Sequence, residues 1–147
     1  MTETRTETET DTNKEPNTVK SPREVIEAHY AAGERGDLPG MLADFSPDIV
    51  WTEAAGFPIG GTYVGVDAVR EAVFIGLAKD WDGWSVAIDE LIVDGETVVG
   101  LGTYSGVNKG TGKSLTTRVS HVWRVRDGKA VRFEQITDTA EVLDAMH

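Results

Sequence analysis

The sequence predicts an α+β fold in which helices come first and an antiparallel sheet follows. Apolar residues recur at helical spacing after residue 20, whereas from Trp84 onward they alternate with polar residues, as they do in strands. Dipeptides typical of hairpin turns, Asp94-Gly95 and Asp127-Gly128, separate the alternating stretches. Because the helices are not interleaved with the strands, we expect an α+β domain rather than a doubly wound parallel sheet.

Length and composition fit one domain behind an acidic arm. The 147 residues match the ~100–200 typical of a domain. Residues 1–20 are mostly Thr and Glu and hold no apolar run, so we expect them to be disordered, with the domain at 21–147. The net charge of −11 argues against nucleic acid or an anionic membrane as a partner. The lack of cysteine, of a secretory signal and of a membrane-spanning apolar stretch favours the cytoplasm.

The helices are predicted from caps and apolar stripes. The first starts at Ser21-Pro22, a capping residue followed by a first-turn proline, and ends at Gly36-Asp37. A second, short helical stripe runs from Leu38 to Phe45, and a third helix opens at Asp67. Residues 48–53 are predicted as a strand, and 54–65, rich in Gly and Pro, as a loop.

The second half of the chain is predicted as a meander of four strands, at 84–93, 97–107, 114–126 and 130–137, with a closing helix at 139–146. The last hairpin admits two registers. A three-residue loop at 127–129 puts every apolar residue on one face: it pairs Val125 with Val131, Trp123 with Phe133 and His121 with Gln135. We therefore expect His121 and Gln135 side by side on the inner face.

Glu53 is the first candidate catalytic residue. It shares a strand face with Ile49 and Trp51, so it is expected to point into apolar surroundings. Loss of hydration there raises a carboxyl pKa and makes the group a proton acceptor near neutral pH. The alternative is a strand-end glutamate that turns out to solvent.

His121 is the second candidate, because it lies in phase with Trp123 and Val125 and therefore points inward. Beside the Gln135 amide it could donate a hydrogen bond to a substrate oxygen. The alternative is a core histidine bonded to backbone or water. His29 and Tyr30 lie near the apolar stripe of the first helix, and we expect at most one of them to point squarely into a cavity.

Aromatic side chains are numerous enough to wall a site for a flat apolar ligand, or simply to fill a core. The candidates for substrate contact are Tyr30, Trp51, Phe57, Tyr63, Tyr104, Trp123 and Phe133. We expect no metal site, because His29, Glu53 and His121 show none of the spacings typical of metal ligands.

Three ordered strings resemble the nuclear-transport-factor-2-like and ketosteroid-isomerase-like superfamily. GERGDLPGMLADFSPDIVWTEAAG is similar to its opening, GTYVGVDAVREAV to its next loop and helix, and HVWRVRDGKAVRF to its last hairpin. The similarity runs from residue 22 to 146 and is greatest to the SnoaL-like (polyketide-cyclase-like) group.

The resemblance implies a cone-shaped α+β barrel with a pocket between the inner sheet face and the first and third helices. It implies a homodimer through the outer sheet face. The strand sequences give slight support for this dimer. Trp84, Val86 and Ile88 share one apolar face and Val98 and Tyr104 share another, and one of the two faces is expected to be exposed. By resemblance, Glu53 occupies the position of the proton-shuttling carboxylate, and His121 and His29 occupy the two oxyanion-hole positions.

These observations predict a cofactor-independent acid–base enzyme acting on a small apolar carbonyl or polyketide-like substrate. The reaction would be an isomerisation, a dehydration or an aldol-type cyclisation. Glu53 is the expected base and His121 the expected oxyanion donor, aided by Gln135 or by His29 or Tyr30. The alternative function is non-catalytic binding of an apolar ligand or interaction between subunits.

Overall fold

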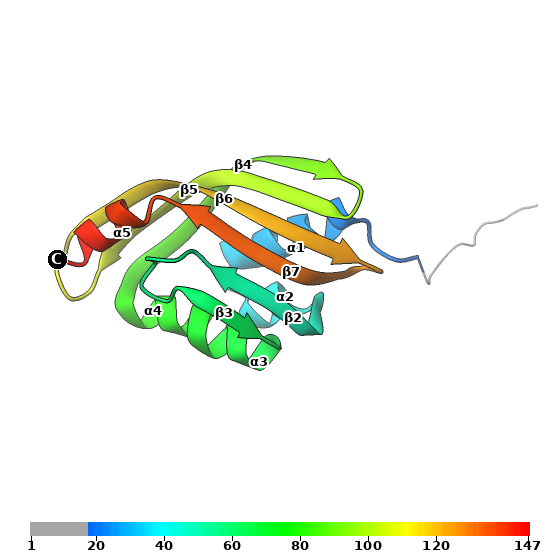
Figure 1. Ribbon diagram of the computed structural model, residues 1–147, viewed down its shortest axis with the longest axis horizontal. Helices are drawn as coiled ribbons and strands as arrows, with labels where there is room; N and C mark the ends of the chain where they lie inside the picture. Colours follow the sequence, from blue (N-terminus) through cyan, green and yellow to red (C-terminus); the bar gives the residue numbers. More distant parts are fainter. Residues whose placement is uncertain (1–17) are drawn as a thin grey trace, which may run out of the picture.

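A curved sheet of six strands forms the body of the protein, whose computed structural model describes residues 18–147 (Figure 1). The strands lie in the order β3 (Gly61–Val64), β2 (Phe45–Glu53), β7 (Lys129–Thr137), β6 (Ser114–Arg126), β5 (Thr97–Asn108) and β4 (Trp81–Asp94). β2 and β7 run parallel, and all other neighbours are antiparallel. The predicted α+β fold with a curved, mainly antiparallel sheet is confirmed, and the sheet stays open between β3 and β4.

Helix α1 (Pro22–Glu34) lies across the sheet, behind it in Figure 1, and contacts strands β4 to β7. Ser21 and Glu24 form the reciprocal capping box that starts it. Helix α2 (Leu38–Leu42) follows. The third predicted helix is continuous from α3 (Val66–Val69) through a π-helical segment (Arg70–Ile75) to α4 (Gly76–Asp80). The closing helix α5 (Thr139–Ala145) packs on β6.

Two predictions for the first half of the chain are wrong. Phe45 does not extend the second helix, because α2 ends at Leu42 and Phe45 is the buried first residue of β2. The segment predicted wholly as a loop contains strand β3, which pairs Tyr63 with Trp51. β3 has only four residues and lies at the sheet edge, mostly exposed, so its sequence shows no buried alternation that predicts a strand.

The last hairpin differs from the prediction at its turn and agrees with it at the site. Asp127 and Gly128, at φ 51° and 75°, form a two-residue loop rather than a three-residue one. Val125 therefore pairs with Ala130, and a register shift follows. Beyond that bulge, Trp123 pairs with Phe133 and His121 with Gln135, as predicted.

The residues used to argue for an exposed dimer face all point inward. Val86 pairs with Tyr104 across β4 and β5, so the two supposed faces are the same one. Val98 and Tyr104 are 0% and 4% exposed, and Trp84 is half-buried against Tyr104. The homodimer stays a prediction without that support.

The predicted disorder of residues 1–20 falls almost wholly outside the described residues. Residues 18–20 have no regular secondary structure, and Lys20 forms an ion pair of 2.8 Å with Asp44. Between residues 18 and 147 no helix is long and apolar enough to cross a membrane.

Candidate active site

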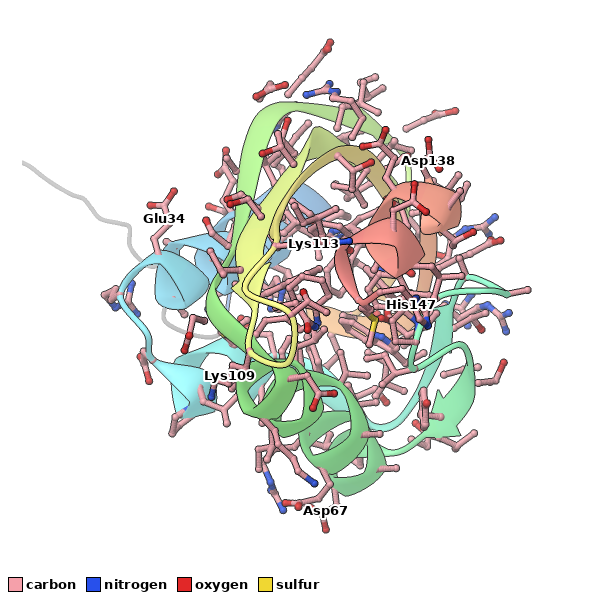
Figure 2. All side chains as sticks on the ribbon, turned by 90° about the vertical axis from the view of Figure 1, so that its left-hand side faces the viewer. Glu34, Asp67, Lys109, Lys113, Asp138 and His147 are labelled. Carbon is pink, nitrogen blue, oxygen red and sulfur yellow. The ribbon has the colours of Figure 1, made fainter. Side chains whose placement is uncertain are left out.

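A cavity of about 760 Å³ lies between the inner sheet face, α1 and the helix of residues 66–80, the walls predicted for it. Glu34 and Lys109 line its outer part, and both lie on the end of the molecule that faces the viewer in Figure 2. Large apolar side chains form most of its wall: Trp51, Val73, Phe74, Leu77, Trp81, Trp84, Val86 and Phe133. The cavity is large enough for a bicyclic or tricyclic molecule.

Glu53 ends strand β2 and points into this cavity. The strand alternation puts Ile49, Trp51 and Glu53 on the buried face, and Glu53 is 2% exposed. The Trp51 indole donates a hydrogen bond of 2.8 Å from Nε1 to Glu53 Oε2. Burial raises the pKa of Glu53 to about 7, against the opposing effect of that bond. The side chain thus points inward as predicted, and its pKa shifts in the predicted direction.

Gln135 connects Glu53 to the rest of the site without lining the cavity itself. The backbone N–H of Ala54 donates to Gln135 Oε1, which turns the amide nitrogen toward the site. From there Nε2 lies 2.8 Å from the Tyr104 hydroxyl and 3.4 Å from Glu53 Oε1. Gln135 therefore orients the Glu53 carboxyl group and the Tyr104 phenol.

His121 lies between two phenols. Its Nδ1 is 2.7 Å from the Tyr30 hydroxyl and its Nε2 is 2.7 Å from the Tyr104 hydroxyl. Burial lowers the pKa of His121 to about 3, with a smaller contribution from His29, so the ring is neutral at physiological pH. Because both ring nitrogens are already bonded, His121 orients the phenols and leaves the contact with a ligand to them.

The protons of this triplet can be counted. The Trp123 indole donates to the Tyr30 oxygen at 2.9 Å, and the Gln135 amide donates to the Tyr104 oxygen, so both phenol oxygens already accept. Burial raises the pKa of both phenols, which keeps them protonated. The two phenols and the neutral imidazole together carry three such protons, and the two hydrogen bonds of His121 use two of them. One phenol proton therefore remains free to donate. The triplet thus offers one O–H donor, on Tyr30 or on Tyr104 according to the tautomer of His121.

Gly100 makes room for this arrangement, and sequence analysis missed it. It pairs with His121 across β5 and β6, and a β-carbon at Gly100 would lie 3.0 Å from the Tyr30 hydroxyl. A glycine at an inward position of a strand indicates the close approach of another group. The alternation along β5 places Gly100 inward, so the sequence already contained the signal that identifies this residue.

Both His29 and Tyr30 line the cavity, although at most one was expected to point into it. His29 is 7% exposed, and its Nδ1 lies 3.0 Å from the carbonyl oxygen of Met41 in α2. Burial lowers the pKa of His29 to about 4. Helical geometry puts adjacent residues about 100° apart, but this cavity wraps around α1 far enough to contact both.

The predicted aromatic contacts divide into two groups. Tyr30, Trp51, Tyr104 and Phe133 line the cavity. The other predicted contacts lie outside its lining: Phe57 packs near Trp84 and Tyr104, Tyr63 donates to the carbonyl of Ile59, and Trp123 is covered by its neighbours at 0% exposed. Phe74, Trp81 and Trp84 line the cavity and were not selected, because a sequence period does not separate a pocket wall from a core.

Apart from Glu53, the acidic and lysine side chains that line the cavity lie at its outer part. Among the lining residues described, Lys109 is the sole lysine or arginine, and it lies 4.0 Å from Asp82 and donates to the carbonyl of Ala78. In residues 18–147 no group of three or more His, Cys, Asp or Glu side chains is arranged to hold a metal ion. The arrangement suits an uncharged ligand and acid–base chemistry at Glu53.

Comparison with known proteins agrees with the fold. The family model of the SnoaL-like domain matches residues 26–133. The chain belongs to the SnoaL-like domain family. The SnoaL-like fold is compatible with polyketide cyclase-type or isomerase activity.

Several solved structures are similar to this SnoaL-like chain over nearly their whole length. An NTF2-like protein of Burkholderia thailandensis is 48% identical, with a TM-score of 0.86, covering 88% of this chain and 99% of its own. An NTF2-like protein of unknown function from Burkholderia pseudomallei is 36% identical, with a TM-score of 0.79 and coverages of 86% and 98%. TerC, co-crystallised with polyporic acid, is 31% identical, with a TM-score of 0.77 and coverages of 85% and 97%. No curated protein matches the sequence.

Proposed function

We propose that the protein is a cofactor-independent acid–base enzyme that removes and returns a proton next to the carbonyl group of a small, uncharged substrate. The observation that carries this proposal is a single one: a buried carboxylate with a pKa raised to about 7 faces the same cavity as an oriented phenol donor. A base whose pKa lies near the working pH is the most effective in proton transfer.

The chemistry follows from the two groups. The Glu53 carboxylate takes a proton from the carbon next to the carbonyl, and the C–H electron pair moves to form an enolate. The remaining phenol proton of the Tyr30–His121–Tyr104 triplet donates to the enolate oxygen. Glu53, now protonated, can deliver this proton to another carbon, which gives isomerisation. Alternatively it exchanges the proton with solvent and delivers a solvent proton to the original carbon, which gives hydrogen exchange. The oxyanion role predicted for His121 thus passes to the phenols that His121 orients.

The charges support an uncharged substrate. Lys109 is already paired with Asp82, and Glu34 and Glu53 would repel an anion. The aromatic wall fits a flat ring system, and the 31% identical TerC was co-crystallised with polyporic acid. We therefore expect small cyclic ketones to be accepted as substrates.

The test measures deuterium uptake by 2-tetralone, an uncharged bicyclic ketone, in heavy water by proton NMR. The wild-type protein should accelerate exchange next to the carbonyl, and Glu53→Gln should lose roughly 10²-fold or more of that rate. Glu134→Gln is the matched control, because Glu134 is exposed on the neighbouring strand β7 and pairs with Thr52. It should exchange at the wild-type rate.

Two outcomes would contradict the proposal. One is wild-type exchange no faster than in buffer. The other is an acceleration that Glu53→Gln retains. Saturable binding of 2-tetralone without exchange, unchanged in Glu53→Gln, would instead support the non-catalytic binding protein.

A further inference from the structure

The two histidines of the cavity differ in how their nitrogens are used. His121 has a hydrogen-bond partner on each ring nitrogen. His29 has one on Nδ1, the Met41 carbonyl at 3.0 Å. A carbonyl oxygen only accepts, so the proton of the neutral His29 ring must be on Nδ1. Nε2 is then left with an open lone pair, and within residues 18–147 it has no hydrogen-bond partner.

The surroundings of His29 make this open nitrogen unusual. The ring stacks on Phe45 at a centroid distance of 5.4 Å and meets the edge of Trp123 at 4.9 Å. The indole N–H of Trp123 is already used by Tyr30 and is not available to Nε2. A buried acceptor without a partner is unfavourable, and such groups commonly bind water or a ligand. The cavity that His29 lines is where such a partner can come from.

From this geometry we infer that His29 Nε2 accepts a hydrogen bond from a hydroxyl group of the ligand, so that the site selects a hydroxylated carbonyl compound. The carbonyl part of this description rests on the proposed function, whereas the hydroxyl part rests on His29 alone. The resemblance placed His29 where an oxyanion donor is expected. The bond to Met41 reverses that polarity, because it leaves Nε2 of this cavity-lining residue as an acceptor.

The three polar positions of the cavity are then complementary to one kind of molecule. One phenol of the triplet donates to a carbonyl oxygen, Glu53 lies beside an acidic C–H, and His29 accepts from an O–H. The ring centroids of His29 and Tyr30 are 5.1 Å apart. We therefore expect the hydroxyl and carbonyl groups to belong to one small molecule. Replacing the hydroxyl by a methoxy group removes its proton and with it the bond to Nε2.

The experiment compares affinities for 2-tetralone, its 5-, 6-, 7- and 8-hydroxy derivatives and their methoxy counterparts, followed by quenching of tryptophan fluorescence. At least one hydroxy isomer should bind roughly threefold to tenfold more tightly than both its methoxy counterpart and 2-tetralone itself. Two variants separate the contributions of the two ring nitrogens of His29. His29→Asn keeps an amide N–H near the Nδ1 position and removes the acceptor, so the preference should disappear. His29→Gln places an amide oxygen near the Nε2 position, so the preference should largely remain.

Nitrogen NMR of the imidazole gives an independent readout. In the free protein His29 should show a protonated Nδ1 and an unprotonated Nε2, and the Nε2 signal should shift on binding of the hydroxy isomer but not of its methoxy counterpart. The inference is overturned if no hydroxy isomer is preferred, if His29→Asn keeps the preference, or if the proton is on Nε2. A wild-type hydroxyl preference without Glu53-dependent exchange would overturn the proposed function and leave this inference standing.

Discussion

The helix wall and the sheet wall of the cavity each hold one buried, neutral histidine, and the two walls treat it differently. On the sheet, His121 is bonded on both sides and belongs to a connected network with Tyr30, Tyr104 and Gln135. On α1, His29 is bonded on one side and has an open nitrogen. A histidine bonded on both nitrogens orients its neighbours, whereas a histidine with an open acceptor has a place for a ligand. Burial and charge alone would not distinguish the two histidines, because both are buried and both are neutral.

The comparison is tested most strongly by replacing each histidine with leucine, which has a similar volume. His121→Leu removes a hydrogen-bond partner from two buried phenols, so we expect a loss of roughly 2–6 kcal/mol in the free energy of unfolding. His29→Leu removes a partner from the Met41 carbonyl alone, and we expect about 1–3 kcal/mol. Urea titrations of the two variants measure the difference, and equal losses would show that the walls do not differ in this way.

The proton count on the sheet wall predicts non-additive effects of the phenols on the exchange of 2-tetralone. Tyr30→Phe and Tyr104→Phe each leave one phenol, and therefore one donor, so each should lose about tenfold or less. The double variant leaves no phenol donor and should lose roughly 10²–10³-fold. Tyr63→Phe, whose hydroxyl bonds to Ile59 away from the network, is the control. Single losses as large as the double loss would contradict the count.

The burial of Glu53 predicts a pH-dependent difference in stability between wild type and Glu53→Gln. The pKa of Glu53 is raised from 4.5 to about 7, so the folded protein binds the proton more tightly than the unfolded chain. That stabilisation is complete below about pH 4.5 and is lost as the pH rises through 7. Relative to wild type, Glu53→Gln should therefore gain roughly 3 kcal/mol between pH 4.5 and 8.

Unfolding of both proteins at several pH values measures that gain. The histidines act in the opposite sense: their lowered pKa values make the fold less stable as the pH falls below about 6.5. Both proteins contain the same histidines, so this effect cancels in the difference. A difference that does not change with pH would show that Glu53 titrates normally.

The smallest expected effect is that of Gly100→Ala, whose added methyl group crowds the hydrogen bond between Tyr30 on the helix wall and His121 on the sheet wall. The new β-carbon would lie 3.0 Å from the Tyr30 hydroxyl and would weaken its bond to His121. We expect a twofold to tenfold loss of exchange, within the range of one weakened neutral hydrogen bond. In a background of Tyr30→Phe the alanine should have no further effect, since the hydroxyl that it displaces is gone. An equal loss in both backgrounds would place the effect elsewhere.

The direction of Glu53 and the pairing of His121 with Gln135 could be predicted because both are local. A strand alternates its side chains with period two, so Ile49 and Trp51 determine the direction of Glu53. A hairpin brings residues together that are close in the chain, and its apolar pattern selected the right pairing at the site although the turn itself was misjudged.

The sequence by itself thus determined the α+β order, five of the six strands, the inward direction of Glu53 and His121, and the candidate base. Only the tertiary structure decided which groups meet across the walls. Tyr30 and His121 are 91 residues apart and bond because α1 packs over a glycine in β5. The carbonyl of Met41, on another helix, settles the tautomer of His29. Residue periods determine which way a side chain points from its own element, whereas the distance between two elements depends on how they pack, and hydrogen bonds require that distance within a few tenths of an ångström.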